Sequence, residues 1–165
     1  MSTQSKLCTY QFEPQFRWEI NQFSVKRKFA QESTHNYLLS EPFYPHKPGY
    51  KFCLTILPGG CHASNREYLP VGFHVMQGQN DSKLAWPMMS TVTIAIVNQE
   101  SNTAYKFVKH NYDSTPDEYK NHFNRPIIRM NKIVRTICFI RFDELSTNQN
   151  LYRNVSIILT CYVNK

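Results

Sequence analysis

The sequence contains no apolar run that approaches the roughly 20 residues needed for a membrane-spanning helix. Its first residues, MSTQSKLCTYQ, also lack the apolar centre of a secretory signal peptide. Nothing in the chain therefore directs it to secretion or into a bilayer. We predict a cytoplasmic protein with no direct membrane insertion.

Cysteine is present, but not in the arrangements that give it a structural or metal-binding role. The five cysteines are odd in number and include no C-x-x-C pair. Cys53, Cys138 and Cys161 fall inside apolar stretches, where a free cysteine behaves as a small hydrophobic residue. We predict mostly buried, reduced thiols, as is usual in the cytosol.

Catalytic motifs are absent as well. The chain has no G-x-S-x-G, no H-E-x-x-H and no glycine-rich phosphate loop. Cys61-His62 is the only neighbouring Cys/His pair, and adjacent residues rarely bind one metal ion together. Asp113, Asp117 and Glu118 lie in a polar stretch with no nucleophile or base to pair with. We predict no enzyme activity, no metal site and no cofactor.

Glycine is rare, with five residues, whereas tyrosine and phenylalanine number 10 and 11. Aromatic side chains suit the half-buried surface of a pleated sheet. Hydrophobic residues make up 41% of the chain, which supports a core and argues against disorder. With 165 residues, the composition predicts one compact domain rich in β-structure.

Alternation of apolar and polar residues predicts short strands along most of the chain. Pro70 and Gly72 indicate an edge position or a bulge in one of them, and residues 116–123 suit a short helix. We predict an all-β fold, an antiparallel β-sandwich of about eight strands, over residues 16–165, after a leader or remnant of an upstream region at residues 1–15. The expected strands are residues 16–20, 24–30, 36–39, 50–57, 68–76, 91–97, 104–109, 133–142 and 155–163.

The chain is basic, with a formal net charge of +7. On a strand, Arg135 and Arg141 would share one face. Such a face either protects an edge strand against aggregation or accepts acidic side chains of a bound peptide. Nucleic acid would require basic residues interleaved with exposed aromatics, and the aromatics here alternate as in a core, so we predict no nucleic-acid partner. The basic cluster consists of Arg125, Arg129, Lys132, Arg135 and Arg141.

Four segments, in order, resemble a known domain. They are FRWEINQF (16–23), SEPFYPHKPGYKFCL (40–54), VMQGQNDSKLAWPM (75–88) and FNRP (123–126). They are similar to the W-x-I-x-x-F, S-x-x-F-Y…G-Y-K-x-C-L, M-x-G-x-x-D-x-x-L-x-W-P-F and F-Q-R-P segments of the C-terminal domain of tumour-necrosis-factor-receptor-associated factors (TRAF), of the broader meprin-and-TRAF-homology (MATH) class. Met88 stands where that family usually has Phe. The resemblance covers about nine-tenths of the chain.

The resemblance implies a signalling adaptor rather than a catalyst. Members of this family bind short extended peptides from the cytoplasmic tails of receptors or from adaptor proteins. The peptide adds as a strand along an exposed sheet edge, and shallow pockets read its side chains. Members form homotrimers through a preceding coiled coil, so that avidity strengthens weak single sites. Phe43, Tyr44, Tyr50 and Trp86 would mainly determine the eight-stranded sandwich.

The peptide-reading positions depart from the family pattern. Where the family commonly has Arg and then an aromatic or His, this chain has Thr55 and Leu57. An acidic position falls on Cys61 and an aromatic position near Gly72. The positions that the resemblance implies for peptide binding are Thr55, Leu57, Cys61, Gly72, Lys120, Asn121, Lys132, Val134, Arg135 and Thr136.

Because Thr55 replaces the arginine that meets an acidic peptide residue in the family, we expect a non-standard specificity. In this hypothesis, Lys132 or Arg135 supplies the positive charge from the other side of the groove. Two alternatives stay open. One is a substrate-recognition MATH module of a ubiquitin ligase or deubiquitinase; the other is a degenerate TRAF scaffold that binds no peptide.

Overall fold

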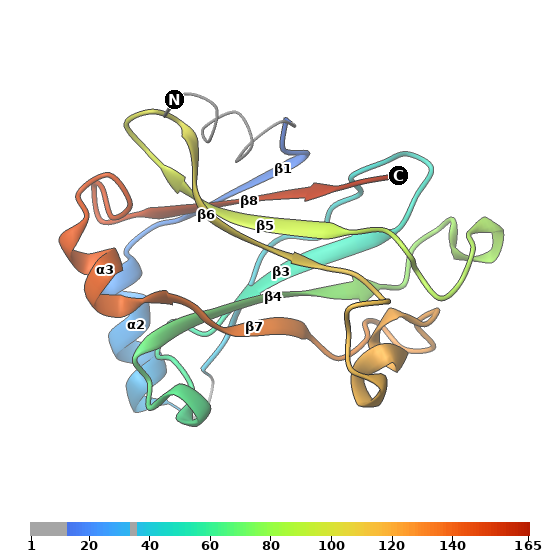
Figure 1. Ribbon diagram of the computed structural model, residues 1–165, viewed down its shortest axis with the longest axis horizontal. Coiled ribbons are helices and arrows are strands. Elements are labelled where there is room, and N and C mark those ends of the chain that lie inside the picture. The colour runs from blue at the N-terminus through green and yellow to red at the C-terminus, as the bar shows by residue number, and fades with distance from the viewer. Residues whose placement is uncertain (1–12, 34–35) are drawn as a thin grey trace.

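The computed structural model describes residues 13–33 and 36–165. Within these ranges, eight strands form two four-stranded antiparallel sheets that lie one above the other (Figure 1). The first sheet has the order β1 (Phe16–Ile20), β8 (Ile157–Val163), β5 (Val92–Asn98) and β6 (Thr103–His110). The second has the order β2 (Leu38–Leu39), β3 (Lys51–Ile56), β4 (Tyr68–Met76) and β7 (Val134–Arg141). The predicted all-β sandwich is confirmed.

The core lies between the two sheets and follows directly from the alternation in the sequence. In β3, Phe52, Leu54 and Ile56 are each at most 1% exposed. They face Ile94 of β5 and its apolar neighbours in the first sheet within one hydrophobic cluster. Because successive strand residues point to opposite sides, the residues between them form the outer face of the second sheet.

Residues 24–30, predicted as a strand, lie instead in helix α2 (Phe23–Glu32). Phe23 and Ala30 are buried, and their seven-residue spacing places them on one helix face. Val25 and Phe29 are largely exposed, so they do not contribute to the core. The prediction of a strand at residues 24–30 is therefore wrong. A second short helix, α3 (Phe142–Thr147), was also not predicted.

Strand β4 is central rather than at an edge, because it pairs with β3 on one side and β7 on the other. The register shifts between Leu69 and Val71, which pair with Ile140 and Thr136. The predicted bulge is therefore confirmed and the edge position is wrong. In the described residues, three short 3-10 helices occupy connections: η1 (His62–Ser64), η2 (Asp81–Lys83) and η3 (Asp117–Phe123). The last of these, η3, matches the short helix expected there.

The segment SEPFYPHKPGYKFCL forms a corner that is bonded to the strand it feeds. The Ser40 hydroxyl accepts a hydrogen bond from the Leu54 amide at 2.9 Å. Phe43 and Phe52 exchange backbone hydrogen bonds of 2.8 and 2.9 Å. The Phe43 ring also stacks on Phe16 of β1 with 4.0 Å between centroids, so this corner joins the two sheets.

The next aromatic pair completes that corner. Trp86 donates from its indole nitrogen to the Asp81 carbonyl at 2.8 Å and meets the Tyr50 ring edge-on at 4.9 Å. The Tyr44 hydroxyl accepts from the Gln79 amide at 3.2 Å. These aromatic residues therefore shape the fold, as the resemblance implies.

The cysteines only partly follow the prediction. Cys53 and Cys161 are buried, Cys61 is half-buried and Cys138 is exposed. Cys138 lies in the irregular part of β7, where the bulge interrupts the alternation that predicted its burial. Cys8 lies outside the described residues.

Most of the expected leader also lies outside the described residues. Gln15, at the end of that leader, forms hydrogen bonds with the backbone of Val163.

Candidate functional site

A continuous row of residues crosses the outer face of the second sheet. Leu39 lies opposite Thr55, Thr55 opposite Gly72, and Gly72 opposite Arg135. Three of the predicted peptide-binding positions, Thr55, Gly72 and Arg135, are therefore neighbours although they are far apart in the sequence. The row leads across the sheet to the edge strand β7.

The floor of this face is closed. Thr55 is 2% exposed and Leu57 7%. A β-carbon on Gly72 would lie 2.3 Å from the Val134 carbonyl oxygen and 2.9 Å from Cδ1 of Ile133. The aromatic residue that the family has near this position could not fit here. The Thr55 hydroxyl is buried without a hydrogen-bond partner among the described residues.

Strand β7 presents an unpaired edge, because β4 is its only partner among the described strands. Arg135 points outward and is exposed. Val134 belongs to the core at 7% exposure, and Thr136 bonds through its hydroxyl to Nε2 of His110 at 3.0 Å. Of the predicted residues on this strand, only Arg135 offers its side chain to a ligand; Val134 and Thr136 could contribute backbone groups alone.

Two histidines hold the chain that enters β7. His122 donates from Nδ1 to the Ile133 carbonyl at 3.0 Å, and His74 donates from Nδ1 to the Asn131 carbonyl at 2.8 Å. Burial lowers the pKa of His74, and the neighbouring His122 lowers it further. Sequence reasoning missed both supports, because isolated histidines carry no local signal for a contact made across the fold.

The basic residues divide into free and engaged groups. Arg141 pairs with Glu67 at 3.0 Å and with Asp143 at 3.7 Å. Lys120 donates to the Tyr112 carbonyl at 3.2 Å and lies over the Tyr112 ring. In contrast, Lys132 and Arg135 are exposed and form no ion pair within the described part of the chain. Positive charge is thus available where β7 begins.

Two further predicted positions flank β7 rather than lie beside Arg135. Cys61 is half-buried just before η1, and Asn121 is exposed within η3. The elements η1 and η3 lie near opposite ends of β7 (Figure 1). They could meet only a ligand that runs along most of that strand.

The part of the chain that the structure describes has no arrangement suited to binding a metal ion. Among residues 13–33 and 36–165, no three His, Cys, Asp or Glu side chains are placed to hold a metal ion. A separate hollow of about 260 Å³ lies beside the corner and the C-terminal residues, where His46 bonds to the Val163 carbonyl at 2.8 Å. It is remote from the row that ends at Arg135.

Comparison with known proteins places this geometry in context. The family model described as TRAF/meprin, MATH domain matches residues 35–159. The chain belongs to the TRAF/meprin MATH-domain family. The resemblance noted in four sequence segments is therefore confirmed.

Relatives and a solved structure agree with this assignment. The chain is 31% identical over 152 residues to TNF receptor-associated factor 6 of Xenopus tropicalis and 29% over 149 residues to TNF receptor-associated factor 2 of Homo sapiens. Each alignment covers 90% of this MATH-family chain but only 26% and 28% of the relative, so the chain spans about a quarter of their length. Notothenia coriiceps TRAF5 shares the fold, with a TM-score of 0.80 and 24% identity over 91% of this chain and 72% of that one.

Proposed function

We propose that residues 16–165 act as a non-catalytic, cytoplasmic adaptor domain that binds short extended peptides of receptor tails or adaptor proteins. The observation that carries this proposal is the unpaired edge of β7 beside the exposed side chain of Arg135. A peptide added as a further strand would satisfy the free backbone donors and acceptors of that edge. A sheet edge left open in this way is otherwise an aggregation liability.

The specificity of the site follows from its charges. Thr55 and Leu57 bring no cation to the floor, and Gly72 leaves no pocket. Lys132 and Arg135 are the free cations at the start of β7 among the residues described. We therefore expect the bound peptide to carry an acidic residue that meets these two side chains.

Each site would be weak by itself, because a short peptide buries little surface and loses conformational freedom on binding. We propose that the longer protein forms a homotrimer through a coiled coil outside this chain. Three linked sites would then bind a clustered receptor much more tightly than one site does.

The decisive experiment is a peptide-display selection against the purified domain, followed by affinity measurements with Arg135→Glu and Lys132→Glu. We expect acidic peptides to be enriched and each reversal to weaken their binding by roughly tenfold or more, as removal of a charge partner costs at an interface. Lys28→Glu, on the exposed face of α2, is the matched control and should leave the affinity unchanged. Enrichment of only neutral or basic peptides would contradict the charge assignment.

A degenerate scaffold is the second candidate, and the closed floor formed by Thr55, Leu57 and Gly72 favours it. This candidate predicts no enrichment above background even when the domain is displayed as an artificial trimer. Amide hydrogen exchange separates the two candidates directly. A bound peptide should slow exchange of the amide hydrogens along β7. A scaffold should show no such protection with any peptide that is added.

A further inference from the structure

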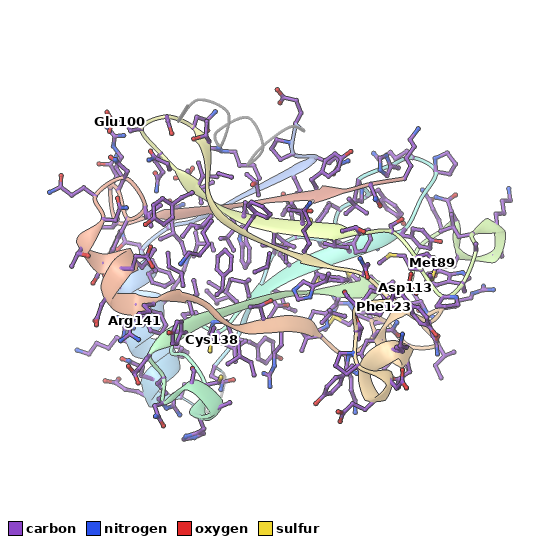
Figure 2. The ribbon with its side chains drawn as sticks, viewed as in Figure 1. Met89, Glu100, Asp113, Phe123, Cys138 and Arg141 are labelled. Carbon is purple, nitrogen blue, oxygen red and sulfur yellow. The ribbon has the colours of Figure 1, made fainter. Side chains whose placement is uncertain are left out.

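The connection between η3 and β7 exposes two adjacent isoleucines. Ile127 is 91% exposed and Ile128 67% exposed. Met89, 52% exposed, lies at the same end of the molecule as Phe123, where this connection begins (Figure 2). Single exposed apolar residues are ordinary on protein surfaces, whereas apolar residues that gather at one place are candidates for an interaction site. We refer to Ile127 and Ile128 as the tip of this connection.

The tip is held in this outward position from both sides. Pro126 is buried, and the Asn131 side-chain amide donates to the carbonyls of His122 at 2.9 Å and Asn124 at 2.7 Å. The Arg129 carbonyl accepts from the Gln77 amide at 2.9 Å. Hydrogen bonds and the buried proline therefore hold the segment that carries the two exposed isoleucines.

Basic residues flank the tip along the chain, although Asp113 lies at the same end of the molecule (Figure 2). From Tyr119 to Phe142 the chain has six basic residues and no acidic residue. Arg125 and Arg129, both exposed, directly flank Pro126 and the two isoleucines. The nearest acids along the chain are Asp117 and Glu118, at the start of η3, and Asp117 is paired with Lys120 at 3.9 Å.

We propose that this tip docks on a membrane surface that carries phosphatidylserine. The two isoleucines would enter the boundary between headgroups and acyl chains, and the arginines would meet the anionic headgroups. Interfacial binding needs this combination of exposed apolar side chains and adjacent basic charge. A protein partner fits less well, because two projecting side chains fall far short of the roughly 1,000 Å² that a stable interface buries.

The contact is peripheral. In the described part of the chain, no helix is long and apolar enough to cross a bilayer. The proposal nevertheless differs from the sequence-based expectation of no direct membrane insertion, since two side chains would enter the interface. It is also independent of the proposed peptide binding. The two sites are nevertheless close in the sequence, since only a few residues, Lys132 among them, separate the tip from the start of β7.

The test is sedimentation of the full 165-residue chain with phosphatidylcholine vesicles that contain or lack phosphatidylserine, at low and at physiological salt. We expect binding to the anionic vesicles alone, weakened by salt. Ile127→Asp/Ile128→Asp should abolish it, and Arg125→Glu/Arg129→Glu should weaken it by about 25-fold or more, since roughly fivefold is lost for each basic residue. The matched control is Val25→Asp/Phe29→Asp, which removes exposed apolar side chains from α2 and should bind like the original chain.

Circular dichroism and thermal unfolding would show that each variant is folded. Binding that survives Ile127→Asp/Ile128→Asp would overturn the proposal, because the tip would not be the site. Equal binding to neutral vesicles would overturn it as well. Absence of binding to any vesicle would also overturn the proposal. The partner of this tip would then be an acidic protein surface instead.

Discussion

At the scale of single residues, Gly72 is the position with least freedom on the outer face. An added methyl group would meet backbone atoms, the Val134 carbonyl oxygen at 2.3 Å and the Arg135 Cα at 2.9 Å. Backbone in a paired strand cannot move away without breaking the ladder. We expect Gly72→Ala to lower the free energy of unfolding by about 1–3 kcal/mol, measured by urea denaturation.

Gly78→Ala is the control for this prediction. A β-carbon there would approach Cβ of Lys51 at 3.1 Å and the Tyr44 ring at 3.3 Å. These distances are longer than those at Gly72 and require only small shifts of the neighbouring side chains, so the loss of stability should be smaller. Equal losses for the two variants would show that the β4–β7 spacing is not the cause.

The cysteines give a second residue-scale prediction, because their burial differs so strongly. Burial raises the pKa of Cys53 to about 11 and raises that of the fully buried Cys161 as well. Only the thiolate reacts with iodoacetamide. We expect Cys138, which is exposed, to be alkylated first at neutral pH, and Cys53 and Cys161 to react only after unfolding.

Peptide mass mapping of partially labelled protein measures this order. The Cys8→Ser variant serves as the starting protein, so that labelling reports only on the described cysteines. Early labelling of Cys53 under native conditions would contradict the packing of β3 against its neighbours.

At the scale of elements, a stacked contact joins α2 to α3. The Arg27 guanidinium lies 3.8 Å from the centroid of the Phe142 ring, and burial lowers the pKa of Arg27 despite the nearby Asp143. The side chain is half-buried, and its Nε is buried without a hydrogen-bond partner among the described residues. We expect Arg27→Ala to reduce stability by about 1 kcal/mol, from the lost stacking and packing.

The neighbouring Lys28 offers a matched comparison on the same helix. Lys28 is exposed, so Lys28→Ala should leave the midpoint of urea denaturation almost unchanged. If both alanine variants had the same midpoint, the stacked contact would not stabilise the position of α2.

At the scale of the whole molecule, two half-buried histidines make the stability of the fold depend on pH. Burial lowers the pKa of His110, which bonds to Thr136 of β7. It also lowers that of His74, which faces Asn131 and His122. The unfolded chain, with histidine pKa values near 6.5, therefore binds more protons than the folded chain. Stability is fully present above about pH 6.5 and declines as the pH falls below it.

Urea denaturation between about pH 7.5 and 5.5 measures this decline, over the range in which an unperturbed histidine titrates. We expect His110→Gln, which cannot be protonated, to be less stable at neutral pH but to lose less stability on acidification. A decline as steep as that of the original chain would show that His110 does not contribute to it.

The β-rich character of the fold, most strand positions and the corner around Phe43 and Trp86 could be predicted from local sequence patterns. These features are local: apolar alternation has the period of a strand, and turn residues end each run. The four family segments lie in this scaffold, which is why the membership in the TRAF/meprin MATH-domain family was predictable.

The residues that reach the outer face beside the free edge could not be predicted in this way, because they depend on how the strands assemble. Whether β4 is central, whether Val134 faces the core and whether Arg141 is already paired all depend on partners far away in the chain. The same holds for α2, since burial of Phe23 and Ala30 against the sandwich selects a helix that their local pattern hardly indicated. Pairing, register and burial arise only when the two sheets assemble. They determine which residues line the candidate site.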